Sequence, residues 1–175
     1  MKKHYYIIFG IIMFIAIVAI SFYVKMGGFA KPEVSLKEYP ASYIKGELYD
    51  GLIREKKFNQ LFVKYAKLVN TKKVNGLLAA YYYNDPEKNG GKVKAIVGII
   101  GSDTSQVEGN ISQLIPAQKV IFTSVKAHFA VASNYYKATE EFAKKNKIKT
   151  KDEGVIEIYP SDNEVILVTP VEKKE

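Results

Sequence analysis

The sequence predicts an α+β domain of two similar halves behind one apolar N-terminal helix. Three observations support this prediction. An uncharged apolar run of 20 residues begins at Tyr5. Beyond it, segments of alternating apolar residues are interrupted by two stretches in which apolar residues recur every three to four positions. The order strand, helix, strand, strand then occurs twice, about 77 residues apart, which indicates a pseudo-twofold, duplicated half-domain.

The apolar run, residues 5–24, has the length of a membrane-spanning helix. At 1.5 Å per residue it reaches about 30 Å, which is the thickness of a hydrocarbon core. Lysines flank it, and aromatic residues gather at its two ends, namely Tyr5, Tyr6, Phe22 and Tyr23. We therefore expect residues 1–25 to be a single-pass transmembrane anchor and the chain to be a membrane protein. The side of the membrane that holds the rest of the chain is left open.

A cleaved secretory signal is the alternative for this segment. Ala19-Ile20-Ser21 has the small-x-small pattern of a cleavage site. The apolar run continues past this site to Val24 and exceeds the usual length of a signal's apolar region. This continuation favours a retained anchor.

Composition excludes several classes of function. The chain has no cysteine, so it carries neither a lipidated cysteine anchor nor disulfides. The net charge of +8 comes almost entirely from lysine, because Arg54 is the sole arginine, and the lysines are scattered among acidic residues. Sequence-specific nucleic-acid binding relies on arginine forks, so we expect no nucleic-acid partner. Attraction to anionic lipid headgroups beside the anchor is a better use of the excess charge.

A short linker separates the anchor from one domain. Residues 26–32 hold two adjacent glycines and a proline, which carry neither helix nor sheet. The remainder, residues 33–175, has the length of a single domain with its own core. It opens with alternating apolar residues around Val34 and Tyr43, which predict two strands separated by the turn Tyr39-Pro40-Ala41.

The rest of the first half predicts a helix and a hairpin. Residues 53–69 place apolar side chains at three- and four-residue intervals opposite lysines, which is typical of an amphipathic helix. Residues 76–83 and 92–101 are rich in strand-forming residues. They flank a loop of Asn, Asp, Pro and Gly, so we expect a β-hairpin.

The second half repeats this order. Ile115-Pro116-Ala117 precedes a predicted strand at residues 119–125, as Tyr39-Pro40-Ala41 precedes the strand at Tyr43. A helix is expected over residues 131–146, followed by strands at 154–159 and 164–169. Matching Gly154 to Gly76 makes Ala79 the first-half counterpart of Glu157. Chance similarity between two α+β halves is the alternative to duplication.

The landmarks of the two halves also resemble a known family. They are Tyr81-Tyr82-Tyr83-Asn84-Asp85-Pro86, Ile115-Pro116-Ala117-Gln118-Lys119, the segment from Gly154 to Tyr159, and Thr169-Pro170-Val171. In this order and spacing, residues 33–171 resemble the GyrI-like small-molecule-binding family, which includes effector-binding domains of multidrug-responsive bacterial transcription regulators. The resemblance implies a pseudo-twofold α+β fold whose two sheets frame an apolar, aromatic-lined pocket. It also implies that an acidic residue at the position of Glu157 faces the ligand.

Glu157 draws attention on physical grounds as well. It lies within the apolar strand Val155-Ile156-Glu157-Ile158-Tyr159, where ionisation is costly unless a cation or hydrogen-bond donors meet the carboxylate. A buried acid among tyrosines suits a lipophilic cation. The alternative is that Glu157 points to solvent. The ligand-binding residues that we predict are Glu157, Tyr81, Tyr83, Tyr159 and Tyr43, with Tyr81 and Tyr83 on the strand face of Ala79.

The sequence therefore favours a membrane-anchored domain that senses or sequesters a hydrophobic, possibly cationic small molecule. It holds no metal-ligand cluster, phosphate loop, dinucleotide motif or nucleophile elbow, so we assign no catalytic residue, metal or cofactor. Whether the chain is an enzyme stays open, with binding favoured over catalysis. The alternatives are a hydrolase that uses Glu157 and Tyr81, a haem protein that uses His128, and a membrane-tethered interaction module with a vestigial pocket.

Overall fold

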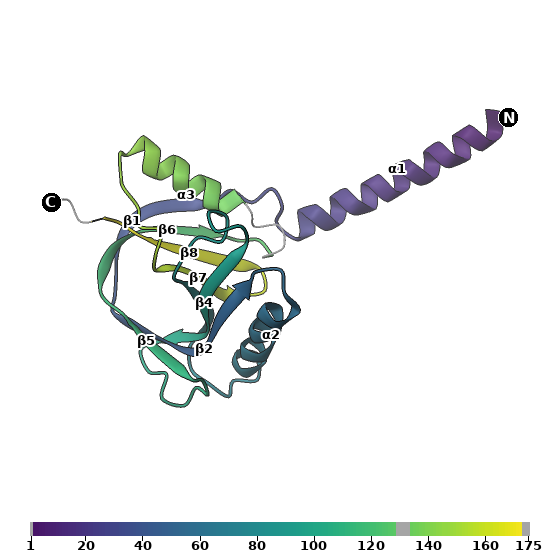
Figure 1. Ribbon diagram of the computed structural model, residues 1–175. Helices are drawn as coiled ribbons and strands as arrows, with labels where there is room; N and C mark the ends of the chain where they lie inside the picture. Colours follow the sequence, from purple (N-terminus) through teal and green to yellow (C-terminus); the bar gives the residue numbers. More distant parts are fainter. Residues whose placement is uncertain (1, 129–133, 173–175) are drawn as a thin grey trace.

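The computed structural model describes residues 2–128 and 134–172, which form a curled antiparallel sheet and three helices (Figure 1). The first helix stands apart from the sheet. In chain order the elements are α1 (Lys2–Lys25), β1 (Glu33–Tyr39), β2 (Ser42–Leu52), α2 (Lys56–Asn70), β3 (Leu77–Tyr82), β4 (Lys92–Gly101), β5 (Ile111–Ile115), β6 (Gln118–Val125), α3 (Asn134–Lys145), β7 (Val155–Ser161) and β8 (Glu164–Pro170).

All eight strands belong to one sheet in the order β1-β6-β8-β7-β3-β4-β2-β5. The sheet curls into a half-barrel, and α2 and α3 cover its outer face (Figure 1). The resemblance implied two sheets. They are continuous here because β3 and β7, one from each half, pair antiparallel at the centre.

The strand order is that of two halves related by an axis between β3 and β7. On one side lie β4 and β2, and on the other side lie β8 and β6. The strand that leads each half crosses to the other half: β1 pairs with β6, and β5 pairs with β2. The two halves therefore share one sheet and interlock at both of its edges.

Apolar clusters occupy both faces of the sheet. On the outer face, α2 buries Phe58, Leu61 and Tyr65 against β2, β3 and β4. Beside it, Tyr135 of α3 packs on the ends of β6 and β8. The concave face carries a third cluster with no helix residue in it, built around Ile44, Ile96, Ile156 and Val168. A side chain's place in the fold thus depends on which face of its strand it occupies.

Both predicted domain helices are present, with shorter bounds. The helix expected at residues 53–69 begins at Lys56 because the chain first turns: Tyr49 Oη donates to the Leu52 carbonyl at 2.8 Å and to Glu55 Oε2 at 3.0 Å. The helix expected at 131–146 is α3, described from Asn134. The expected start, Val131, lies outside the described residues.

Seven of the eight strands agree with the sequence-based segments. The exception is β5, which sequence analysis did not predict. Its five residues alternate between exposed positions and positions that are half-buried or, at Ile115, buried, a pattern too short to stand out from a loop. It forms through pairing with β2, for example Tyr43 with Leu114.

Candidate functional site

Glu157 lies in the middle of β7 and is only 6% exposed. Its cross-strand partner is Ala80, so both residues occupy the same face of the sheet. Ala80 belongs to the cluster that packs under α2, which identifies this face as the outer one. The alternative that Glu157 points to solvent is therefore wrong.

Four tyrosine hydroxyls donate hydrogen bonds to the Glu157 carboxylate. Oε1 accepts from Tyr135 at 2.6 Å and from Tyr136 at 2.7 Å. Oε2 accepts from Tyr82 at 2.7 Å and from Tyr159 at 2.7 Å. An ionised carboxylate only accepts hydrogen bonds and offers about four acceptor positions, so the four hydroxyls saturate it. We call these five residues the Glu157 cluster.

Three elements supply the tyrosines. Tyr82 comes from β3, while Tyr159 lies two residues beyond Glu157 on the same face of β7. Tyr135 and Tyr136 are consecutive, and the first turn of α3 directs both toward the sheet with their ring centroids 4.7 Å apart. Phe62 of α2 packs edge-to-face on Tyr159 at 5.7 Å. The cluster thus lies on the outer face between the two helices.

The electrostatics keep the four tyrosines protonated. Burial raises the pKa of Tyr82, Tyr135, Tyr136 and Tyr159, and the negative charge of Glu157 raises each pKa further. Protonated phenols are donors, which is what the carboxylate requires. Among the described residues, no basic side chain lies within ion-pair distance of Glu157. Within the described part of the chain, the charge of Glu157 is therefore stabilised by hydroxyl dipoles and not by an ion pair.

The predicted site residues separate into two groups. Glu157 and Tyr159 are together in the cluster. Tyr81 and Tyr83 lie on the concave face, where their rings form an edge-to-face pair 5.0 Å apart. Tyr43 lies on β2 and is 44% exposed. The structure does not bring these last three residues to Glu157.

The different placement of Tyr81 follows from an offset of one residue in the matching of the halves. A twofold axis normal to the sheet keeps each residue on its face, so the counterpart of Glu157 must share its face. That residue is Ala80, its partner across the axis, and not Ala79, which pairs with Ile158. With the axis between Ala80 and Glu157, the shift between β3 and β7 is 77 residues, and it makes Tyr82 the counterpart of Tyr159.

Sequence reasoning missed Tyr82, Tyr135 and Tyr136. The one-residue offset explains the first. The signal for the other two was a tyrosine pair at the start of an amphipathic helix, which is visible in the sequence. Its meaning depends on the helix docking over β7, which the sequence alone does not reveal.

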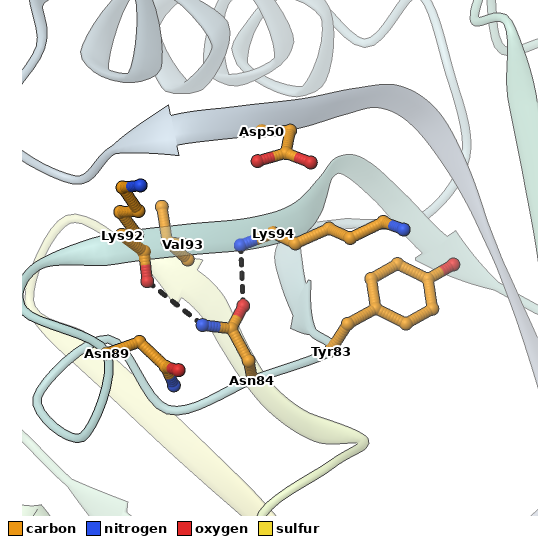
Figure 2. Close-up of a pocket in the computed structure, with 7 residues that line it drawn as sticks. All are labelled: Asp50, Tyr83, Asn84, Asn89, Lys92, Val93 and Lys94. Carbon is orange, nitrogen blue, oxygen red and sulfur yellow. Dashed lines mark hydrogen bonds between the residues drawn. The ribbon is translucent and has the colours of Figure 1, made fainter.

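A surface pocket of about 270 Å³ lies elsewhere, on the side of the sheet that carries Tyr83 (Figure 2). It is lined by Asp50, Tyr83, Asn84, Asn89, Lys92, Val93 and Lys94. Asn84 stabilises its wall, since its amide donates to the Lys92 carbonyl at 2.9 Å and accepts from the Lys94 N–H at 2.6 Å. The pocket includes no member of the Glu157 cluster.

Over residues 2–128 and 134–172, no three His, Cys, Asp or Glu side chains are grouped to hold a metal ion.

The helix α1 is the one described segment long and apolar enough to cross a membrane. Its residues Tyr5–Lys25 have a mean hydropathy of 2.8, and none of that apolar stretch is buried. A signal sequence near an N-terminus has the same properties, so length and composition alone do not place α1 in a membrane.

No protein-family model and no curated protein matches the chain. Solved structures do. An integron cassette protein from the mobile metagenome of Vibrio cholerae is 14% identical with a TM-score of 0.59, over 79% of this chain and 95% of that one. SAV2435 bound to tetraphenylphosphonium is 10% identical with a TM-score of 0.56, over 80% and 94%.

The C-terminal domain of EcmrR is a third similar structure, 17% identical with a TM-score of 0.56, over 82% of this chain and 99% of that domain. In the EcmrR–DNA complex the match spans 58% of the EcmrR chain, so this protein corresponds to one part of that chain. At these identities the likeness shows the fold. Behind its N-terminal helix, the chain has the fold of the EcmrR C-terminal domain, which is consistent with the GyrI-like fold that the sequence resemblance implies.

Proposed function

We propose that this protein is a membrane-anchored receptor for a hydrophobic cation, with Glu157 as the charge partner. The observation that supports it best is the buried Glu157 carboxylate, which accepts hydrogen bonds from four tyrosine hydroxyls and forms no ion pair with a basic side chain of the described residues. Such a group attracts a cation, and the tyrosine rings around it offer faces for cation–π contact.

The cluster is closed, so a ligand must displace hydroxyls. Tyr136 is the most exposed of the four, at 43%, and Tyr135 lies beside it on the first turn of α3. Breaking two hydrogen bonds to a charged group costs about 3–6 kcal/mol. A neutral ligand recovers little of that cost. A desolvated cation recovers it through the carboxylate and through aromatic faces worth about 2 kcal/mol each.

Tetraphenylphosphonium is the natural probe, because SAV2435, which shares the fold, has been determined with this cation bound. Its four phenyl rings also suit an aromatic site. For this chain the cation is a representative of the ligand class, and the physiological ligand is not identified by it.

Calorimetry on the full chain in detergent tests the proposal. Glu157→Gln keeps the shape and removes the charge, so we expect tetraphenylphosphonium binding to weaken by about 2–5 kcal/mol. Triphenylphosphine oxide, a neutral analogue, should bind both forms weakly and alike. Glu38→Gln, an exposed acid on β1, is the matched control and should bind the cation as the unmodified chain does. Equal cation affinity for Glu157→Gln would remove Glu157 from the function.

The membrane part of the proposal relies on α1. An apolar helix with none of its stretch buried against the domain would be costly in water, at about 25 cal/mol per Å² of apolar surface. Insertion in a bilayer removes that cost. Alkaline carbonate extraction should leave the protein with the membrane pellet. A soluble mature chain beginning near Phe22 would show instead that the helix is a cleaved signal.

A further inference from the structure

The turn that follows α1 is fixed to the domain. The Met26 carbonyl accepts a hydrogen bond from the His128 N–H at 2.9 Å. Gly27, with φ +77°, presses its backbone on the segment after β6: a Cβ on Gly27 would lie 2.6 Å from the Lys126 carbonyl oxygen and 2.9 Å from Ala127 Cα. This joint, Met26 to Ala30 against Lys126 to His128, is a tight contact.

The joint shares an apolar cluster with the proposed ligand site. Ala30 packs in the cluster that contains Ala127 and Tyr135, and Tyr159 packs against the same cluster. The joint and two members of the Glu157 cluster therefore belong to one packed unit. Helix α3 begins near the joint and runs away from it (Figure 1).

Aromatic side chains are exposed at the joint. Phe29 is 71% exposed and packs edge-to-face on Tyr23, with ring centroids 5.1 Å apart. Exposed aromatic rings at the end of an apolar helix are typical of the membrane–water interface. Lys25, Lys31 and Lys126 are exposed here, but Glu33 and Asp162 lie at the same end of the sheet. Because charges of both signs lie at this end, the rigid geometry of the joint, and not net charge, would bring this end of the domain to the lipid surface.

We infer that this end of the domain, the joint with the first turn of α3, rests in the phospholipid headgroup layer of the bilayer that holds α1. Amphiphilic cations that partition into this layer then reach Glu157 past Tyr136. The inference relies on the proposed function, both for α1 in the membrane and for cation binding at Glu157. The headgroup layer is about 5–8 Å thick on each side. Ala30 follows Lys25 by only five residues and turns back, since its N–H bonds the Gly27 carbonyl at 2.8 Å.

Single tryptophans test this placement, because the chain has no Trp of its own. Lys137→Trp and Lys144→Trp form a matched pair on α3: their lysines are 78% and 79% exposed, and each makes a weak ion pair with a glutamate four residues away. They are seven residues, or about 10 Å, apart along the helix. In vesicles with lipids brominated near the top of the acyl chains, we expect at least twofold stronger quenching at position 137 than at position 144.

Two glycine variants test whether the joint is responsible. Gly27→Ala drives a methyl group into the Lys126 carbonyl, whereas Gly90→Ala has a similar backbone, φ +62°, with no atom within 4 Å of the new Cβ. The difference in quenching should vanish in the Gly27→Ala background and persist with Gly90→Ala. Equal quenching at positions 137 and 144 in the otherwise unmodified chain overturns the inference, and so does a difference that survives Gly27→Ala. If Gly27→Ala fails to fold, the first comparison decides alone.

The outcomes separate this inference from the proposed function. If α1 does not enter the membrane, carbonate releases the chain. If Glu157 does not bind cations, Glu157→Gln leaves tetraphenylphosphonium binding unchanged while the quenching difference remains. In a membrane-retained protein, equal quenching at the two positions, or a difference that survives Gly27→Ala, counts against the headgroup contact itself.

Discussion

Tyr82 and Tyr159 donate to the same oxygen of Glu157, Oε2, at the same distance of 2.7 Å. With a shift of 77 residues between the central strands they are counterparts in the two halves, related by the axis between β3 and β7. The two tyrosines that the sheet supplies to the Glu157 cluster are therefore symmetric about this axis. The asymmetry of the cluster comes from the carboxylate, which stands opposite Ala80, and from α3, which alone adds Tyr135 and Tyr136.

This symmetry predicts equal effects of Tyr82→Phe and Tyr159→Phe on stability. Each change removes one hydroxyl from a buried carboxylate, a loss of about 1.5–3 kcal/mol. Urea unfolding of the full chain in detergent, followed by near-ultraviolet circular dichroism, measures the free energy of unfolding. Tyr81→Phe is the matched control: Tyr81 neighbours Tyr82 but faces the concave side, so its loss should be close to zero. Comparable losses in all three variants would contradict the cluster.

Removal of the Tyr136 hydroxyl should strengthen ligand binding. Its hydroxyl occupies Glu157 Oε1 and competes with a cation for the carboxylate. Tyr136→Phe keeps the ring for cation–π contact and removes the competitor, so tetraphenylphosphonium should bind about ten- to a hundredfold more tightly, from the 1.5–3 kcal/mol of one such bond. Weaker binding in this variant would mean that the hydroxyl contacts the ligand directly.

High pH should unfold the domain through these tyrosines. The pKa of Tyr82, Tyr135, Tyr136 and Tyr159 is raised by burial first and by the Glu157 charge second. A folded pKa above the unfolded value of about 10 gives stability that is complete below pH 10 and is lost as the pH rises, because only the unfolded state releases the protons. Tyrosinate absorbance should thus show four tyrosines that ionise at a higher pH than the others, cooperatively and together with unfolding.

The glutamine variant provides the control for the alkaline titration. In Glu157→Gln the charge that helps to raise these pKa values is absent, so the four tyrosines should ionise at lower pH. A titration curve that is the same with and without the Glu157 charge would contradict the assignment of that charge as a cause.

Much of the fold was readable from the sequence because the signals were local. The apolar spacing of Phe58, Leu61 and Tyr65 specifies α2, and the run of strand-forming residues at 92–101 specifies β4. Strand β5 was not readable, because its order depends on pairing with β2, a contact distant in sequence. The crossing of β1 and β5 between the halves is likewise a property of the assembled sheet.

Sequence analysis selected Glu157, the acid of the candidate site, but missed three of the four tyrosines that donate to it. Glu157 was found because a carboxylate within an apolar strand is costly unless something meets it. The choice of tyrosines depended on strand register, and an offset of one residue moves every side chain to the other face. That offset selected Tyr81 in place of Tyr82. The same offset selected Tyr83, whereas Tyr43 was chosen by residue type, and the structure places each of them away from Glu157.

Moving the acid across the axis gives the last prediction. Ala80→Glu with Glu157→Ala keeps the side-chain volume of the pair and places a carboxylate opposite the native one. Tyr82 and Tyr159 flank both positions. On the α2 side, however, Phe58 and Phe62 carry no hydroxyl, and the hydroxyl of Tyr65 already donates to the Glu108 carbonyl at 3.0 Å. The relocated carboxylate therefore gains two donors in place of four.

We expect this double variant to lose about 3–6 kcal/mol of stability relative to the unmodified chain, from two missing hydrogen bonds to a charged group. Its affinity for tetraphenylphosphonium should fall as far as in Glu157→Gln, because the first turn of α3, the proposed entrance, no longer leads to a charge. Urea unfolding and calorimetry on the same preparation measure the two effects. Cation binding equal to that of the unmodified chain would show that the site is symmetric in function, and that Tyr135 and Tyr136 serve stability alone.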